Sequence, residues 1–134
     1  MQEEIVLTQR EKYLFNRLVS LAKMNKLTSY SEEAARLNPP ILARHPSYCK
    51  MLDRINTYSY QKYGLFLAAI VKHKSSDTVG MGFFVAVCNC TNLKKPLDKM
   101  DLKQNLSYYN NFWKQSIKDL FDNIDKIELE DLSG

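Results

Sequence analysis

The side chains that could carry covalent or metal chemistry in this sequence are its two histidines and three cysteines. Cys49 follows His45 by four residues, so on a helix the two would share one face, as a thiol nucleophile and its general base do. Cys88 and Cys90 have one residue between them, whereas zinc sites usually place roughly two to four residues between paired cysteines. No orienting acid or oxyanion site is evident beside His45 and Cys49, and no further metal ligands are evident beside Cys88 and Cys90. We therefore predict no catalytic residue, no metal and no cofactor.

A second candidate for chemistry is the backbone around Gly80 and Gly82. Glycines on either side of one residue allow a ligand or another backbone segment to approach closely. No phosphate-loop spacing follows them, and close packing explains them equally well. An enzyme that uses Cys49 or this glycine pair therefore stays an open alternative to a protein without catalytic activity.

Basic side chains form the most coherent pattern. The formal net charge is +4, and residues 1–74 hold 12 lysines and arginines against 6 acidic residues, whereas residues 75–134 hold 7 against 9. The first half of the chain therefore offers a surface for an acidic partner. Six of its basic side chains lie on a predicted third helix or at the tip of a predicted hairpin, and we expect them to contact nucleic acid: Arg44, His45, Lys50, Arg54, Lys72 and Lys74. An ordinary solvated surface is the alternative interpretation.

Three predicted helices position the first of these residues. Residues 8–26 repeat apolar side chains at helical spacing. Ser29 and Glu32 fit a capping box at the start of a short second helix, which ends before Pro39. Pro46 suits the first position of a third helix, on which Lys50 and Arg54 share one face.

The most apolar stretch of the chain predicts a β-hairpin. Residues 65–71 are a continuous apolar run of strand length, residues 75–77 supply turn chemistry, and residues 79–84 form the returning strand. Residues 83–90 are apolar on every side, so periodicity leaves open whether they are strand or helix. Residues 107–127 predict a last amphipathic helix, and we expect residues 128–134 to be frayed.

These elements predict a single α+β domain over residues 1–134. It is helix-rich, with a β-hairpin, a winged-helix-like core and an added C-terminal helix. The odd number of cysteines argues against a disulfide framework, and the charged N-terminus lacks an apolar signal region. No apolar run is long enough for a membrane span. We therefore expect a cytoplasmic protein without membrane contact, of undetermined oligomeric state.

Residues 28–37, TSYSEEAARL, resemble the TYxEIA-type helix of the DNA alkyltransferase-like family, whose C-terminal part is a winged helix. The reactive PCHR segment of the alkyltransferases is absent, and Cys49 lies instead in SYCK. The resemblance therefore implies no alkyl transfer and carries over no catalytic residue.

A longer likeness, spanning most of the chain, is to a family of small uncharacterised bacterial proteins. Its members share a YxExA helix, an apolar strand, a PGxGFF-like turn and a later FW pair. The corresponding segments here are Tyr30–Ala34, Leu65–Val71, Val79–Phe84 and Phe112-Trp113, with Val79 in place of the proline of the turn. This resemblance implies no particular activity.

From these observations we expect a non-enzymatic nucleic-acid-binding or regulatory module, with DNA contacted by the basic helix and hairpin. The alternative is a protein-interaction module, such as an inhibitor or a subunit of a larger assembly. It is suggested by the many aromatic residues and by an acidic C-terminal segment that could mimic or mask nucleic acid.

Overall fold

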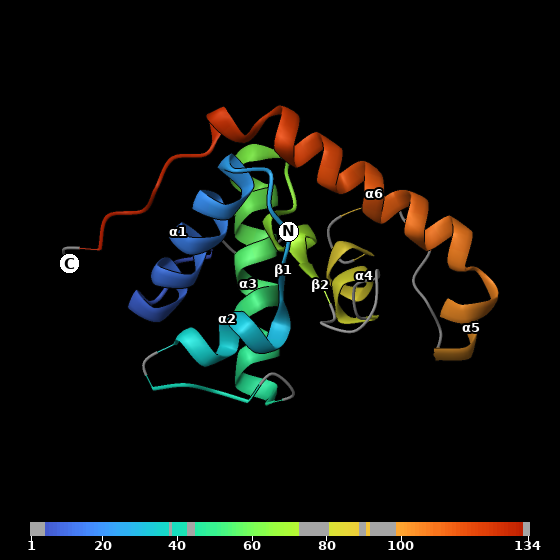
Figure 1. Cartoon of the computed structure of the whole chain (residues 1–134), viewed down its shortest axis with the longest axis horizontal. Coiled ribbons are helices and arrows are strands. Elements are labelled where there is room, and N and C mark those ends of the chain that lie inside the picture. Colours follow the sequence, from blue (N-terminus) through green and yellow to red (C-terminus); the bar gives the residue numbers. More distant parts are fainter. Residues whose placement is uncertain are drawn as a thin grey trace.

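The structure is a computed structural model that describes residues 5–37, 39–42, 45–72, 81–88, 91 and 99–132. Most of these residues are helical, and α1, α2 and α3 gather at one side, while α6 begins beside α5 and crosses the molecule toward α1 and α3 (Figure 1). Of the helices described, none is both long enough and apolar enough to span a membrane. The elements in chain order are α1 (Gln9–Lys23), β1 (Thr28–Ser29), α2 (Tyr30–Arg36), α3 (Pro46–Tyr63), the 3-10 helix η1 (Leu67–Ile70), β2 (Val71–Lys72), α4 (Met81–Cys88), α5 (Lys99–Gln104), α6 (Leu106–Asp122) and the 3-10 helix η2 (Ile124–Lys126).

Local capping signals fix where the first three helices begin. Thr8 and Glu11 form a capping box, in which each side chain accepts a hydrogen bond from the backbone N–H of the other, at 3.2 and 2.9 Å. The Ser29 hydroxyl accepts from the backbone N–H of Glu32 at 3.2 Å and caps α2. Pro46 occupies the first turn of α3, as predicted.

The predicted β-hairpin is wrong. Residues 67–70 form η1 rather than a strand, and Met81–Cys88 form α4, so residues 81–84 cannot be the returning strand. The predicted turn at 75–77 lies outside the described residues. The only strand pairing among the described residues joins β1 to β2 in parallel, with Thr28 opposite Val71 and Ser29 opposite Lys72.

Side chains of α3 explain why the apolar run is not a strand. The Asn56 side-chain oxygen accepts from the backbone N–H of Ala68 at 3.1 Å, and Asn56 is 2% exposed. The Ser59 hydroxyl accepts from the N–H of Leu67 at 3.1 Å and donates to the carbonyl of Leu65 at 2.7 Å. These buried partners satisfy backbone groups that a neighbouring strand would otherwise have to pair. Residues 65–70 are therefore buried without belonging to a sheet, and only Val71 at the end of the apolar run lies in β2.

Two hydrophobic clusters hold the helices together. The first joins α1, α3 and η1 to the end of α6 and to η2. The second is mainly aromatic and lies between η1, α4 and α6, where Trp113 donates its indole N–H to the carbonyl of Ala69 at 2.7 Å. The last helix docks on the core through the buried side chains of Tyr109, Trp113 and Leu120.

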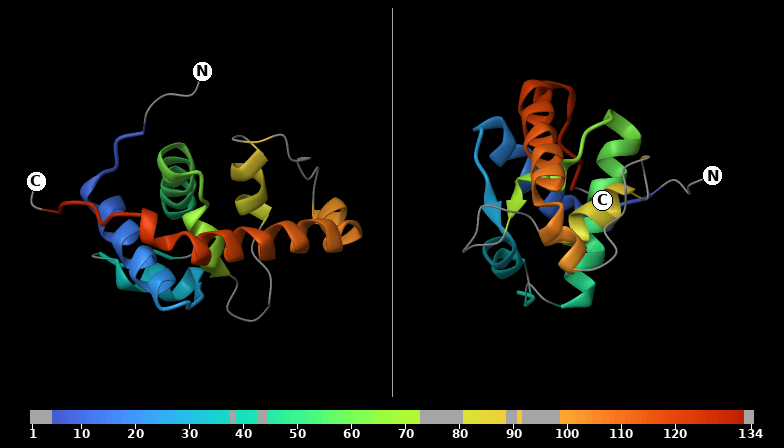
Figure 2. Two further views of the ribbon diagram at one scale, coloured as in Figure 1. Left: turned by 90° about the horizontal axis from the view of Figure 1, so that it is seen from above. Right: turned by 90° about the vertical axis from the view of Figure 1, so that its right-hand side faces the viewer.

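The segment after η2 lies beside α1, although it is far away in sequence (Figure 2). Asn16 on α1 donates to the carbonyl of Glu130 at 2.9 Å and accepts from its N–H at 2.7 Å, across 114 residues. The Glu130 carboxylate accepts from the Tyr58 hydroxyl at 2.9 Å and lies 3.9 Å from the Lys62 ammonium. The structure thus gives Glu130 partners on both α1 and α3.

Candidate nucleic-acid interface

The structure describes four of the six basic residues that the sequence selects. Arg44 and Lys74 lie outside the described residues. His45 is exposed and caps α3, because its Nδ1 accepts the backbone N–H of Ser47 at 3.1 Å. Lys50 lies one turn further along α3 and is also exposed. The start of α3 therefore presents two of the selected residues to solvent.

Arg54 has a structural role. Its Nε donates to the Glu11 carboxylate at 2.8 Å, and its Nη2 donates to the backbone carbonyl of Val6 at 2.7 Å. The Glu11 side chain is 3% exposed and that of Arg54 is 33% exposed. Because a buried carboxylate needs a compensating charge, Arg54 pairs with Glu11 and so links α3 to the start of α1. Its charge is already largely balanced before any partner binds.

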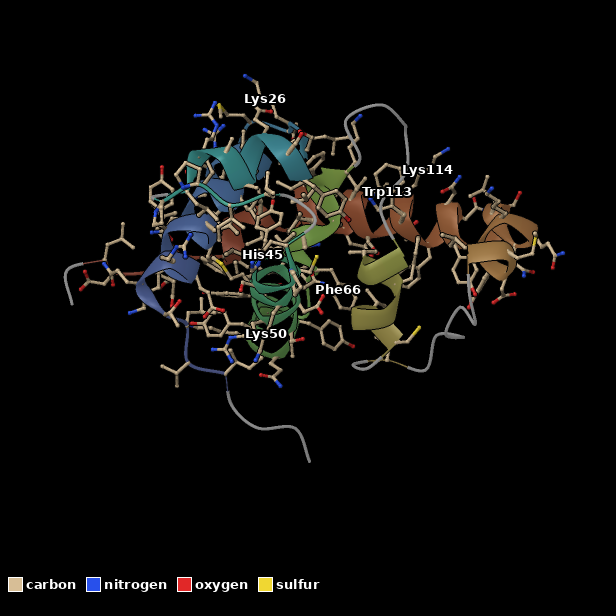
Figure 3. All side chains as sticks on the ribbon, turned by 90° about the horizontal axis from the view of Figure 1, so that it is seen from below. Lys26, His45, Lys50, Phe66, Trp113 and Lys114 are labelled. Atoms are coloured by element: carbon tan, nitrogen blue, oxygen red, sulfur yellow. The ribbon has the colours of Figure 1, made fainter. Side chains whose placement is uncertain are left out.

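Lys50 and Lys72 lie on different sides of α3. Side chains at positions i and i+2 of a helix point in directions about 160° apart around its axis, so Lys50 points away from Tyr48. Tyr48 is buried and donates a hydrogen bond from its hydroxyl to the Tyr30 carbonyl at 2.8 Å. Tyr30 follows Ser29, and Ser29 is the strand partner of Lys72, so Lys72 lies toward the Tyr48 side of α3. Figure 3 shows Lys50 on the side of α3 that faces away from α2. The structure therefore does not bring Lys50 and Lys72 together.

One acidic residue shares the exposed side of α3 with Lys50. Asp53 is exposed and lies three residues after Lys50. Although the residue as a whole is exposed, partial burial of its carboxyl group by neighbouring atoms raises the pKa of Asp53 from 3.8 to about 6. Near neutral pH this side chain is charged and reduces the positive potential around Lys50, and in mild acid it becomes neutral.

Of the two cysteine-containing pairs that the sequence singles out, the structure describes both members only for His45 and Cys49. Cys49 is exposed, and the Nδ1 of His45 is occupied by the helix cap. No three histidine, cysteine or acidic side chains are grouped as a metal site among the described residues. Cys90 and His73, like the Gly80 backbone, lie outside those residues, so the glycine-based alternative is not addressed by the structure.

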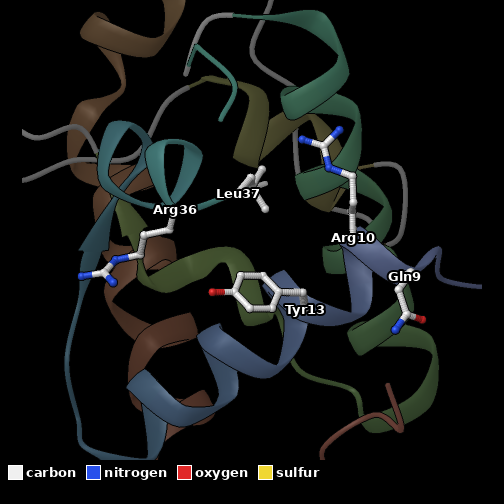
Figure 4. Close-up of a pocket in the computed structure, with 5 residues that line it drawn as sticks. All are labelled: Gln9, Arg10, Tyr13, Arg36 and Leu37. Carbon is white, nitrogen blue, oxygen red and sulfur yellow. The ribbon is translucent and has the colours of Figure 1, made fainter. Parts of the chain in front are cut away.

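A groove that the sequence did not indicate lies between α1 and the end of α2. It has a volume of about 380 Å³ and is lined by Gln9, Arg10, Tyr13, Arg36 and Leu37. In Figure 4, the Tyr13 ring lies below Leu37, with Arg36 at one side and Arg10 at the other. The groove thus combines an apolar floor with cationic side chains.

Two arginines of the groove are held in different ways. Arg10 donates through Nη2 to the Pro39 carbonyl at 2.8 Å, and its buried Nε has no hydrogen-bond partner in the described part of the structure. Arg36 forms an exposed ion pair with Glu32 at 3.5 Å. The sequence places Arg10 on the solvated side of an amphipathic helix. It carries no signal that Pro39 folds back against that side.

No protein-family model matches this chain, and neither the curated proteins nor the solved structures contain a significant match to it.

Proposed function

We propose that the protein is a non-enzymatic nucleic-acid-binding or regulatory module that contacts phosphates with the first turns of α3. The observation that carries the proposal is the exposed start of this helix, which presents His45 and Lys50. Positive side chains of this kind supply most of the sequence-independent affinity for nucleic acid.

The order of elements supports this assignment. The three helices α1, α2 and α3 follow one another as expected for a winged-helix-like core, which is part of the proposal, whereas β2 pairs in parallel with β1 in place of the expected hairpin. In helix-turn-helix proteins, the second helix of the pair contacts DNA through its N-terminal residues. Here α2 and α3 are separated by residues 37–45, which is longer than the usual turn of about three to four residues. We therefore assign phosphate contact to α3 and no reading of base sequence.

The test measures how affinity for duplex DNA depends on salt, between about 50 and 200 mM. Lys50→Glu should weaken binding at every concentration and reduce the slope of log affinity against log salt by about one. Lys114→Glu is the matched control, because Lys114 is also exposed but lies on α6, away from α3 (Figure 3). Equal affinities and slopes for the two variants would contradict the proposal. Arg54 is left unchanged because its loss would disturb the fold.

A second candidate function is protein interaction, and the far end of α6 favours it. Three large apolar side chains are exposed on α5 and the first turn of α6: Met100 at 60%, Leu106 at 43% and Tyr108 at 41%. Exposed apolar side chains that form a contiguous patch mark contact surfaces, which is the basis of this second candidate. Recovery of one stoichiometric protein partner after nuclease treatment, lost in a Leu106→Ser variant, would favour this function over nucleic-acid binding.

A further inference from the structure

The groove between α1 and α2 has the size and lining of a small-ligand site. Its volume of about 380 Å³ lies in the range of roughly 300 to 1,000 Å³ that is usual for such sites. Leu37 at its floor is 3% exposed, whereas Tyr13 is 46% exposed. The groove therefore combines a half-exposed aromatic side chain with a buried leucine.

Arg10 gives the groove an anchored positive charge. Its hydrogen bond to the Pro39 carbonyl fixes the guanidinium plane without neutralising it, because a carbonyl carries no net charge. Its buried Nε lacks a hydrogen-bond partner among the described residues. The rest of the guanidinium stays accessible at the surface, where an anion can form charge-assisted hydrogen bonds with it.

We propose that this groove binds one nucleotide of an unpaired strand, with the base stacked on Tyr13 and the phosphate held by Arg10. Aromatic side chains stack on unpaired bases, and arginine matches phosphate geometry. The inference rests on the proposed function, to which it adds a preference for single-stranded or frayed ends. It places the site on α1 and α2, away from Lys50.

Glu32 limits the contribution of Arg36. The Arg36 guanidinium points away from Tyr13 toward the outside of α2, where Glu32 pairs with it (Figure 4). Neutralising Glu32 would free this second cation to turn toward a phosphate in the groove. Both side chains are about half exposed, at 48% for Arg36 and 53% for Glu32, so the pair is weak and can be exchanged for a ligand contact.

The first experiment titrates adenosine monophosphate into the labelled protein and follows NMR signals of the Tyr13 ring and the Arg10 side-chain N–H. Adenosine and inorganic phosphate are titrated separately. We expect the nucleotide to shift both signals and to bind at least about fivefold more tightly than either part, since stacking and phosphate contact each contribute. No shift at these signals, or equal binding of phosphate alone, would overturn the inference.

The second experiment uses variants. Tyr13→Ala should weaken binding of the mononucleotide and of a 5′-phosphorylated single strand by roughly fivefold to a hundredfold, and leave duplex affinity unchanged. Glu32→Gln should tighten binding several-fold. The control is Tyr108→Ala, which removes a similarly exposed tyrosine from α6, at 41%. Equal losses in Tyr13→Ala and Tyr108→Ala would count against the groove.

The two proposals fail separately. If duplex binding depends on Lys50 while the mononucleotide leaves Tyr13 and Arg10 undisturbed, the groove assignment is wrong and the proposed function stands. If the mononucleotide binds at Tyr13 while duplex affinity is insensitive to Lys50→Glu, the role of α3 is wrong and the groove stands.

Discussion

The ion pair between Arg54 and Glu11 makes a prediction that separates folding from nucleic-acid binding. The Glu11 carboxylate is almost fully buried and has two partners, the backbone N–H of Thr8 and the guanidinium of Arg54. Arg54→Met removes one partner and keeps a side chain of comparable length. The carboxylate is then left buried with a single hydrogen bond.

The size of the effect follows from the burial of the two partners. Removing one member of a buried pair costs about 3 to 5 kcal/mol, and the partial exposure of Arg54 favours the lower end. Loss of the hydrogen bond from Arg54 to the Val6 carbonyl increases the cost by about 1 kcal/mol, which offsets the reduction caused by the partial exposure of Arg54. We expect a loss of about 3 kcal/mol of unfolding free energy, which lowers Tm by about 10 °C for a domain of this size.

A double-mutant cycle with Glu11→Gln tests the origin of this loss. Glutamine keeps the capping box with Thr8 but carries no charge. The double variant should therefore be more stable than the sum of the two single losses predicts, with a coupling energy of about 2 kcal/mol by urea denaturation. The salt slope of DNA binding should stay unchanged for folded Arg54→Met protein.

Two outcomes would refute the reasoning. If Arg54→Met costs less than about 0.5 kcal/mol, the pair is no stronger than an ordinary surface salt bridge. If the variant is stable but its salt slope falls by about one, Arg54 contacts phosphate directly and its contact with Glu11 is secondary.

Further predictions concern pH, the tail and the buried amide of α3. The folded protein binds the Asp53 proton more tightly than the unfolded chain does, because the pKa is about 6 in the folded state and 3.8 in the unfolded state. The stability that this proton contributes is therefore lost as pH rises from 3.8 through about 6, and the exposure of Asp53 keeps the effect small. DNA affinity should accordingly rise as pH falls from about 7 to 5, and Asp53→Asn should bind more tightly at pH 7 with a weaker pH dependence. Asn16→Ala should speed amide exchange at Glu130 by about tenfold, because it removes both bonds to that backbone. Asn56→Ala should lower unfolding free energy by about 1 to 3 kcal/mol in denaturant titrations, since the Ala68 N–H stays buried without its acceptor.

Helix starts could be predicted from the sequence because their signals are local. Each signal acts on backbone groups within a few residues, and the structure has a helix after each of them: Thr8 with Glu11 before α1, Ser29 before α2 and Pro46 at the start of α3. The wide apolar stripe of α6 likewise indicates which side docks on the core. In both cases the interactions that decide the outcome lie in neighbouring turns.

The central segment and the site depend on contacts that the sequence does not reveal. Residues 65–68 satisfy their backbone through Asn56 and Ser59, so an apolar run of strand length becomes a 3-10 helix. Arg54 looks like a free surface cation until Glu11 is found beside it. Arg10 becomes part of a groove only because Pro39 returns to α1. The positions of Arg44 and Lys74 stay predictions.

The tail beside α1 has a consequence for how the protein is made. Ile127 is 1% exposed within the first core cluster, and Glu130 bonds to Asn16 across 114 residues. A growing chain on the ribosome has made α1 and α3 long before it contains either of these late residues. The apolar faces of α1 and α3 must therefore wait until these later residues have been synthesised, and the nascent chain is most vulnerable to proteases and self-association during that interval.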